Sequence, residues 1–324
     1  MPTSRRISVL LLAYNQASTV RGAAESLLAQ ACEPLEVILS DDASSDETYA
    51  VLEDVARVYR GPHAVRARRN ASNLGIGAHY NRLITESTGE LLVTAGGDDL
   101  SLPSRVAKLA AAWDATGGRA DLVASHFIDL LPSGELGKRV ATDDLAEVTL
   151  QGWLARRPYI VGATHAFTRR VMSRFGPFIE GLWYEDQVMT FRAIVSGGGI
   201  TVPEPLVHYR RGGSSQWAHA GCGSSLVRWT GVQNRRLLAE IAQLERDAEI
   251  AGCRDEVHRV LAGMLQRERF LEALVNAEST RERWRALGTA PTLPLGWRVG
   301  KLLRFVFPDY AAALKRRRLK RKAD

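Results

Sequence analysis

Runs of apolar residues alternate with helical periodicity along the first third of the chain. The apolar run at residues 7–12 is nearly continuous, as in a strand buried on both faces of a parallel sheet. A helical pattern follows at 18–30, with Ser18 or Thr19 as its N-cap. We expect further strands at 35–39, 64–68 and 91–93 and further helices at 47–59, 78–86 and 104–113. This order predicts an α/β fold with a mostly parallel sheet flanked by helices.

The next part of the chain continues the mixture of strands and helices. Further strands are expected at 121–129, 165–168 and 200–210. Residues 129–150 between them look like a variable loop. In this loop, the acidic pair Asp143-Asp144 is expected to cap a helix or to lie in a solvated turn.

The pattern changes after residue 223, where only helical periodicity remains. Gly252 separates two expected helices, and Pro291 and Pro294 mark a linker. We therefore expect an α/β domain at 1–223, a helical extension at 224–290 and an amphipathic basic tail at 291–324.

Polar side chains stand at the ends of three expected strands. They are Tyr14, Asn15, Asp41, Asp42, Asp98 and Asp99. Ligands bind beyond the carboxyl ends of parallel strands, so these side chains are expected to line one site. Acidic helix caps explain a single Asp at each end but explain doubled Asp poorly. Because adjacent carboxylates repel each other unless a cation lies between them, the pair Asp98-Asp99 indicates a metal–diphosphate site.

Charge is concentrated at the C-terminus. The chain of 324 residues carries a formal net charge of +7, of which residues 315–324 contribute +6. A nearly neutral body argues against a nucleic-acid groove, and the basic tail indicates a local electrostatic contact. No apolar run reaches the roughly 20 residues that span a bilayer. The three scattered cysteines, Cys32, Cys222 and Cys253, are typical of reduced cytosolic thiols.

Residues 7–217 resemble family 2 glycosyltransferases, which have the GT-A fold and bind nucleotide sugars. The segments that carry the resemblance are 8–15, 39–46, 73–77 with Asn81, 89–93 leading into Asp98-Asp99, 185–186 and 208–210. Each segment alone is a weak signal, but their order and spacing are specific.

The resemblance implies that the first two strand ends bind the donor nucleotide. Ala13, Tyr14 and Asn15 would belong to the donor site, with the Tyr14 ring packed on the nucleobase. Asp41 would accept a hydrogen bond from the imino N–H that uracil, thymine and guanine all offer. Asp42 would reach the ribose or orient the neighbouring loop.

Two later segments complete the implied donor site. Asn73 and Gly75 lie where family members let the backbone approach the nucleotide sugar. Arg210 and Ser214 belong to a Gly- and Ser-rich segment, and arginine forks and backbone N–H groups in such a segment bind phosphate oxygens well. We expect residues 210–223 to form a mobile lid over the diphosphate, with a surface arginine as the alternative for Arg210.

The resemblance also implies a divalent cation, Mg²⁺ or Mn²⁺. Asp99 is the expected direct ligand, and Asp98 is a second ligand or a contact to the sugar. His208 is a further metal or phosphate contact, or a plain strand-end histidine. Family members often have an Asp where this chain has Gly96 or Gly97.

A second acidic pair, Glu185-Asp186, begins an expected helix. Acids at a helix N-terminus also have a structural explanation through the helix dipole. In the family this position supplies the catalytic base, and Asp186 is our choice over Glu185. No residue is evident as a nucleophile for double displacement, so a single displacement with inversion is expected.

The residues after 294 favour an anchor at an anionic membrane surface. One helix face is apolar through Leu295, Val299, Leu302, Leu303 and Val306, and another is basic through Arg298, Lys301 and Arg304. With the basic run at 315–322, this pattern is typical of a membrane-surface helix. A docked helix with a solvated tail is the alternative.

These features predict an inverting, metal-dependent hexosyl- or deoxyhexosyltransferase in polysaccharide biosynthesis. The donor would be a UDP- or dTDP-sugar and the acceptor a lipid-linked or polysaccharide hydroxyl. The protein would be cytoplasmic, peripheral at the inner face of the cytoplasmic membrane, and would bind no nucleic acid. The alternatives are a non-catalytic nucleotide-sugar-binding or scaffold protein and a nucleotidyltransferase. The latter needs a basic phosphate loop that residues 13–18 lack.

Overall fold

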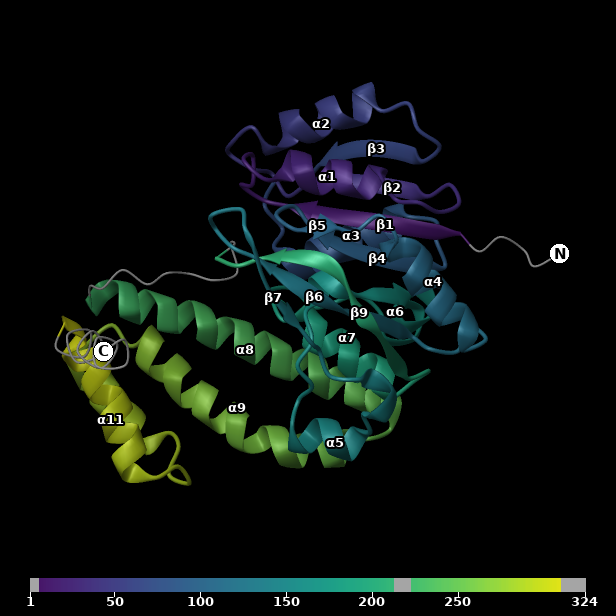
Figure 1. Cartoon of the computed structure of the whole chain (residues 1–324). Helices are drawn as coiled ribbons and strands as arrows, with labels where there is room; N and C mark the ends of the chain where they lie inside the picture. The colour runs from purple at the N-terminus through teal and green to yellow at the C-terminus, as the bar shows by residue number, and fades with distance from the viewer. Residues whose placement is uncertain (1–5, 213–222, 310–324) are drawn as a thin grey trace. The chain divides into compact units, whose positions relative to one another are not determined.

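The computed structural model describes residues 6–212 and 223–309. The chain divides into two compact units, Met1–Gln216 and Trp217–Asp324 (Figure 1). Of the described helices, none is both long and apolar enough to cross a bilayer.

The first unit is built on one nine-stranded sheet. Its strands are β1 (Ile7–Ala13), β2 (Glu36–Asp41), β3 (Ala64–Arg69), β4 (Leu91–Gly96), β5 (Leu100–Ser101), β6 (Leu122–Leu130), β7 (Leu136–Val140), β8 (Ala166–Thr168) and β9 (Gly199–Arg210). Their order is β3-β2-β1-β4-β8-β6-β9-β5, with β7 paired to β6. The half made of β3, β2, β1 and β4 is parallel, so the carboxyl ends of β1, β2 and β4 meet at one edge.

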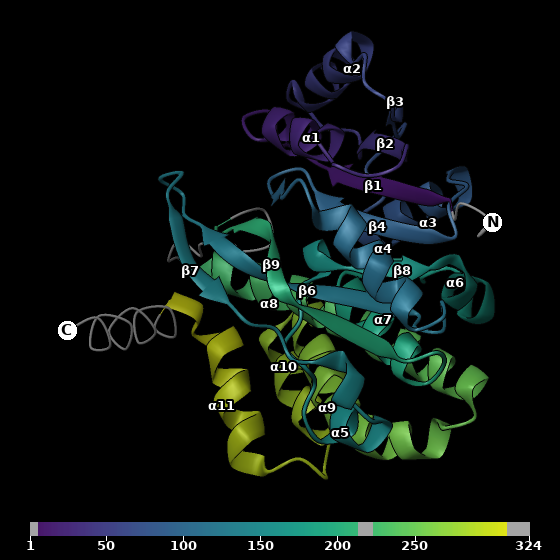
Figure 2. The same cartoon turned by 45° about the vertical axis from the view of Figure 1, so that its right-hand side comes forward.

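The other half of the sheet is mixed (Figure 2). Strand β8 runs antiparallel to β4 and β6, β5 runs antiparallel to β9, and β6 and β9 are parallel. The expected α/β fold is thus confirmed, but parallel pairing dominates only the first half. The short β8 and β5 are too brief for periodicity to reveal their direction.

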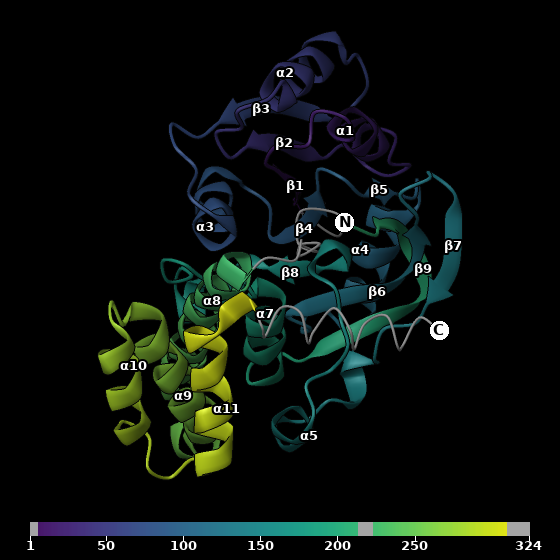
Figure 3. The ribbon, with the colours of Figure 1, turned by 90° about the vertical axis from the view of Figure 1, so that its left-hand side faces the viewer.

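Helices cover both faces of this sheet. They are α1 (Val20–Leu28), α2 (Thr48–Val58), α3 (Ile76–Glu86), α4 (Arg105–Ala115), α5 (Leu150–Ala155), α6 (Arg169–Phe175) and α7 (Glu185–Ile194). Apolar residues of α1, α2 and α4 form one core with Val9 and Leu11 of β1, while Leu10 between them is buried toward the opposite face. Figure 3 shows α1 and α3 on opposite sides of β1 and β2. Burial on both faces explains the continuous apolar run at the N-terminus.

The segment expected to be a variable loop contains regular structure. Strand β7 pairs with β6, and the 3₁₀ helices η1 (Leu145–Glu147) and η2 (Gly162–Thr164) lie on either side of α5. The expectation for the acidic pair there is confirmed, because Asp144 caps η1 by accepting a hydrogen bond from the Ala146 N–H at 3.1 Å. Thr19 occupies the N-cap of α1 as expected. However, its hydroxyl donates to the Gly97 carbonyl at 3.0 Å and makes no cap bond.

The second unit is helical over its described part. It contains α8 (Gly223–Ala251), α9 (Arg254–Asn276), α10 (Thr280–Arg285), η3 (Ala286–Gly288) and α11 (Leu295–Val306). Gly252 separates α8 from α9 with a φ of 77°, as its place in the sequence predicted. Leu302 and Phe305 of α11 are buried in one apolar cluster with Phe270 and Leu274 of α9. The helix expected to start a separate tail therefore shares a core with the extension.

Candidate active site

Hydrogen bonds join the segment after β1 to the turn after β2. The Asn15 N–H donates to Ser44 Oγ at 2.8 Å, and Asn15 Oδ1 accepts from the Ser45 N–H at 2.9 Å. Asn15 and Ala43 adopt left-handed backbone conformations, with φ of 52° and 58°. Asn15 therefore holds the turn after β2, and its predicted donor contact stays a prediction. Next to it, Ala13 is buried, whereas Tyr14 is 44% exposed and offers a ring for stacking.

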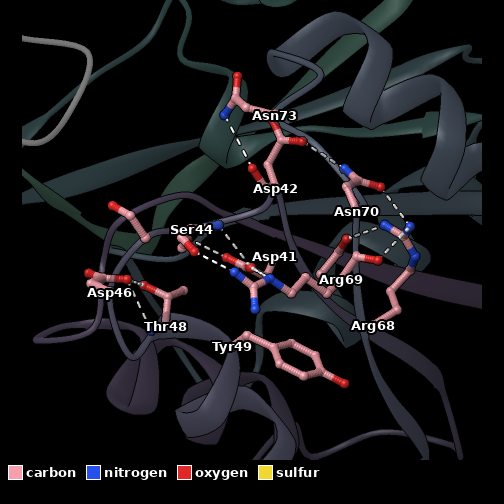
Figure 4. Close-up of polar contacts among 12 residues, drawn as sticks. Asp41, Asp42, Ser44, Asp46, Thr48, Tyr49, Arg68, Arg69, Asn70 and Asn73 are labelled. Carbon is pink, nitrogen blue, oxygen red and sulfur yellow. Dashed lines mark hydrogen bonds and ion pairs between the residues drawn. The ribbon is translucent and has the colours of Figure 1, made fainter.

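Asp41 is fully buried and already has partners within the chain (Figure 4). Its Oδ2 accepts from the Ser44 N–H at 3.0 Å and pairs with Arg69 Nε at 3.2 Å, and its Oδ1 accepts from the Ser44 hydroxyl. Arg69 also lies over the Tyr49 ring, 5.7 Å from its centroid. A nucleobase that bonds to Asp41 would have to take the place of Arg69.

Asp42 orients the loop before α3. Its carboxylate accepts from Asn70 Nδ2 at 2.7 Å (Figure 4). It also accepts from the Leu74 N–H at 2.9 Å and the Gly75 N–H at 3.0 Å. Asn73 Nδ2 in turn donates to the Asp42 carbonyl at 3.2 Å. Of the two roles predicted for Asp42, these contacts favour holding the loop over reaching a ribose.

Side chains crowd the end of β4 at the positions where the resemblance leads us to expect an acidic residue. A Cβ at Gly96 would lie 2.9 Å from Asp99 Oδ2 and 3.1 Å from Asp98 Oδ1. Both carboxylates therefore fold back over the Gly96 backbone. A Cβ at Gly97 would lie 2.5 Å from Gln16 Oε1. Because both positions are crowded, glycines stand where the family often has Asp.

The surroundings of Asp98 and Asp99 raise the pKa of both carboxyl groups. Asp99 is buried, and burial, followed by the charge of Asp98, raises its pKa to about 7. Burial also raises the pKa of Asp98. Arg210, predicted to bind the diphosphate, contacts this pair instead. Its backbone N–H donates to Asp99 Oδ1 at 2.8 Å, and its side-chain Nε donates to the Asp98 carbonyl at 3.0 Å. A buried and a half-buried carboxylate held this way fit a hard divalent cation.

The third predicted metal residue, His208, does not complete a cluster. It lies in β9 opposite Leu100 of β5, and burial lowers its pKa. Across residues 6–212 and 223–309, no three His, Cys, Asp or Glu side chains are grouped as a metal centre. A cation at Asp98-Asp99 would therefore take most of its ligands from phosphate oxygens and water, as Mg²⁺ commonly does.

The second acidic pair begins α7. Glu185 Oε1 lies over Gly162 of η2, where an added Cβ would be 2.8 Å away. Burial, followed by the charge of Asp186, raises the pKa of Glu185 well above its ordinary value. The small cavity beside it is lined by Tyr80, Thr94, Gly162, His165, Phe167, Phe178, Glu185 and Met189. Burial thus favours the neutral form of Glu185.

Asp186 has a more polar environment. Its Oδ1 accepts from the Gln187 N–H at 2.7 Å, and the positive charge of Arg157 favours its ionised form. Burial raises its pKa, but these two contacts oppose the shift. Of the two carboxyl groups, Asp186 therefore has the better support for its ionised form, which makes it the candidate base.

Two side chains near these pairs were missed from the sequence. Arg105 is buried at the start of α4, and Thr94 is buried in β4. The only hint was an arginine close after Asp99 on the helix that carries buried Val106 and Leu109. Ser214, predicted to contact the diphosphate, lies outside the described residues, as does most of the expected lid.

Comparison with known proteins finds similarity to glycosyltransferases. Residues 8–130 match the sequence model of glycosyl transferase family 2. The chain is 32% identical over 108 residues to EpsE of Bacillus subtilis (strain 168), a glycosyltransferase by name, which covers 33% of this chain and 38% of EpsE. It is 26% identical over 333 residues to the succinoglycan biosynthesis protein ExoO of Rhizobium meliloti (strain 1021), covering 95% and 90% of the two chains. The first curated relatives are thus matched over only about a third of their length.

Solved structures share the fold. Residues 1–349 of TarS from S. aureus, in complex with UDP-GlcNAc, superpose with a TM-score of 0.55 at 16% identity, covering 97% of this chain and 92% of that one. The mannosyltransferase PcManGT from Pyrobaculum calidifontis, in complex with GDP-Man and Mn²⁺, gives 0.54 at 18% identity, covering 97% and 88%. Residues 8–130 of the α/β unit thus match glycosyl transferase family 2, and the fold of this chain is that of the GT-A glycosyltransferases.

Proposed function

We propose that the protein is an inverting, metal-dependent glycosyltransferase. It would move a hexosyl or deoxyhexosyl group from a UDP- or dTDP-sugar to a hydroxyl of a lipid-linked or polysaccharide acceptor. The observation that carries this proposal is the presence of two acidic pairs with different environments. Asp98-Asp99 is suited to a divalent cation, whereas in Glu185-Asp186 the ionised form is better supported at Asp186 than at Glu185.

The donor half of the proposal depends on Asp99 and Tyr14. Asp99 is the proposed metal ligand, with Asp98 beside it, and the exposed Tyr14 ring is the proposed platform for the base. A divalent cation there would stabilise the charge that develops on the departing diphosphate. The complexes of TarS with UDP-GlcNAc and of PcManGT with GDP-Man and Mn²⁺ support a nucleotide sugar and a divalent metal.

The acceptor half depends on Asp186. A sugar hydroxyl is a weak nucleophile, and a carboxylate beside it accepts the proton as the new bond forms. Burial favours the neutral form of Glu185, which is a poor nucleophile, and we therefore propose a single displacement that inverts the anomeric centre. The full-length similarity to ExoO, a succinoglycan biosynthesis protein, supports a glycan acceptor.

The proposed location is the cytoplasmic face of a membrane. Leu303 and Phe307 are exposed on or next to α11, at 41% and 56%, and the chain continues into the basic residues 315–322. Leu302, expected on the membrane face, is buried in the core of the second unit. We therefore propose that the exposed apolar side chains and the basic tail contact anionic lipid together.

The catalytic assignment is tested by separating donor binding from transfer. We expect Asp186→Asn to keep the affinity for UDP within about twofold and to lower transfer by about 10²-fold to 10⁴-fold, because the base is lost. Glu185→Gln is expected to lower transfer far less, since burial favours the protonated form of Glu185. Exposed Glu180→Gln serves as the matched control. Normal turnover in Asp186→Asn would rule out Asp186 as the base.

A further inference from the structure

Arg105 places a positive charge inside the first unit. Its side chain is 1% exposed at the first residue of α4, six residues after Asp99. Burying a guanidinium is costly unless its N–H groups are satisfied, so its contacts indicate what it does.

The guanidinium joins two segments that are far apart in the sequence. Its Nη2 donates to the carbonyl of Thr94 in β4 at 2.7 Å and to that of Ala163 in η2 at 2.7 Å. Its Nη1 donates to Ser101 Oγ at 2.9 Å. Thr94 reinforces the same junction, because its hydroxyl donates to the Gly162 carbonyl at 2.8 Å.

Each side of this junction leads to one acidic pair. Beyond Thr94, β4 ends at Gly96, and the carboxylates of Asp98 and Asp99 fold back over that glycine. On the other side, Gly162 of η2 lies directly under the carboxylate of Glu185. A shift between β4 and η2 would therefore change the separation of the two acidic pairs.

We infer that Arg105 is a positioning residue that fixes Glu185-Asp186 relative to Asp98-Asp99. The inference depends on the proposed function, in which the donor sits at one pair and the acceptor hydroxyl at the other. The charge of Arg105 also acts on Asp99 and on Tyr80, on either side of the junction. Burial lowers its pKa to about 10, so it remains charged at neutral pH. Misplacing reacting groups by about 1 Å can cost 10²-fold in rate.

A second arginine in the same unit provides a matched control. Arg169 also bridges separate segments through carbonyls, donating to Gly89 O at 2.8 Å, Ile84 O at 2.7 Å and Ser87 O at 2.9 Å. These contacts lie at the start of β4, at the opposite end from its acidic pair. Loss of Arg169 should therefore reduce stability without disturbing the junction at η2.

The test compares Arg105→Met, the milder Thr94→Val and the control Arg169→Met in the full chain. Hydrogen exchange is measured for the amides of 160–168 and, as a reference, of β1. We expect the first two variants to exchange at least about tenfold faster at 160–168 while β1 stays protected. Arg169→Met should leave 160–168 unchanged. Unchanged exchange at 160–168 in both junction variants, or equal acceleration across the sheet, would overturn the inference.

Turnover provides the second measurement. The probe is hydrolysis of the sugar nucleotide that stabilises the wild type most in the presence of Mn²⁺, with folded sites counted by calorimetric titration of the nucleoside diphosphate of that same sugar nucleotide. We expect Arg105→Met to lower kcat per folded site by about 10²-fold with KM for the donor within about threefold. Retained kcat per site would overturn the positioning role. A wild type that binds neither UDP nor dTDP would instead contradict the proposed function, and the exchange result would still report on the junction.

Discussion

A buried histidine, His165, lies near the acidic pair Glu185-Asp186, and its surroundings favour its neutral form. His165 is buried beside the cavity next to Glu185, and burial, followed by the charge of Arg105, lowers its pKa to about 3. The imidazole is therefore neutral at physiological pH. Its Nε2 has no hydrogen-bond partner among the residues that the structure describes.

This histidine predicts a specific pH dependence of stability. The unfolded chain protonates His165 near pH 6.5, whereas the folded protein does so only near pH 3, so folding loses stability as pH falls below about 6.5. At pH 5 the loss is about 2 kcal/mol. We expect His165→Leu to show a smaller drop in melting temperature between pH 7.5 and pH 5 than the wild type. Buried His79, with a pKa lowered to about 4, remains in both proteins and cancels in the comparison. An identical drop in the two proteins would show that His165 titrates normally.

Segments far apart in sequence meet at the ends of the strands, and this limited what the sequence could show. Apolar runs and helical periodicity were sufficient to predict the strands and helices of the parallel half. The doubled acids indicated the edge of the sheet where the carboxyl ends of β1, β2 and β4 meet. The pairing of Arg69 with Asp41 and of Arg105 with Ala163 could not be predicted, because it depends on strand order and side-chain direction. Strand β7 was missed because its short, mostly exposed sequence lacks an apolar alternation.

The loop before α3 offers a test at this scale. Asp42 accepts from two backbone N–H groups and from Asn70, so Asp42→Asn replaces one acceptor oxygen by a donor. We expect a loss of about 1.5–3 kcal/mol in the free energy of unfolding, as for hydrogen bonds to a charged group. Chemical denaturation measures it, with Asp54→Asn on the surface expected to cost clearly less. A cost for Asp42→Asn no larger than that of Asp54→Asn would contradict this role.

The whole molecule combines an α/β unit that carries the proposed chemistry with a helical unit that carries exposed apolar and basic residues. Within the helical unit, neighbouring residues near the end of α11 face different environments. Phe305 is 4% exposed within the core, whereas Leu303 and Phe307 are 41% and 56% exposed. The proposed membrane contact and the stability of the unit can therefore be changed separately.

We expect the double variant Leu303→Glu, Phe307→Glu to sediment less with anionic liposomes while its melting temperature changes little, because both side chains are exposed. Phe305→Ala should instead destabilise the protein by about 3–5 kcal/mol through the cavity it leaves. Neutral liposomes serve as the reference for the charge contribution of the tail. Undiminished sedimentation of the double variant would refute a lipid contact by these side chains.

The proposed function depends on Asp99 binding a cation together with a nucleotide sugar. The most direct measurement is the melting temperature of wild type, Asp99→Asn and the exposed control Asp255→Asn with UDP-, dTDP- and GDP-sugars, each with and without Mn²⁺. At a ligand concentration of about 100 Kd, binding adds about 2.7 kcal/mol, which corresponds to a shift of about 5 °C. We predict such a shift for wild type and Asp255→Asn with at least one nucleotide sugar, only when Mn²⁺ is present, and its loss in Asp99→Asn. A shift in melting temperature that is independent of Mn²⁺, or one that Asp99→Asn retains in full, would contradict the proposed metal-dependent binding at Asp99.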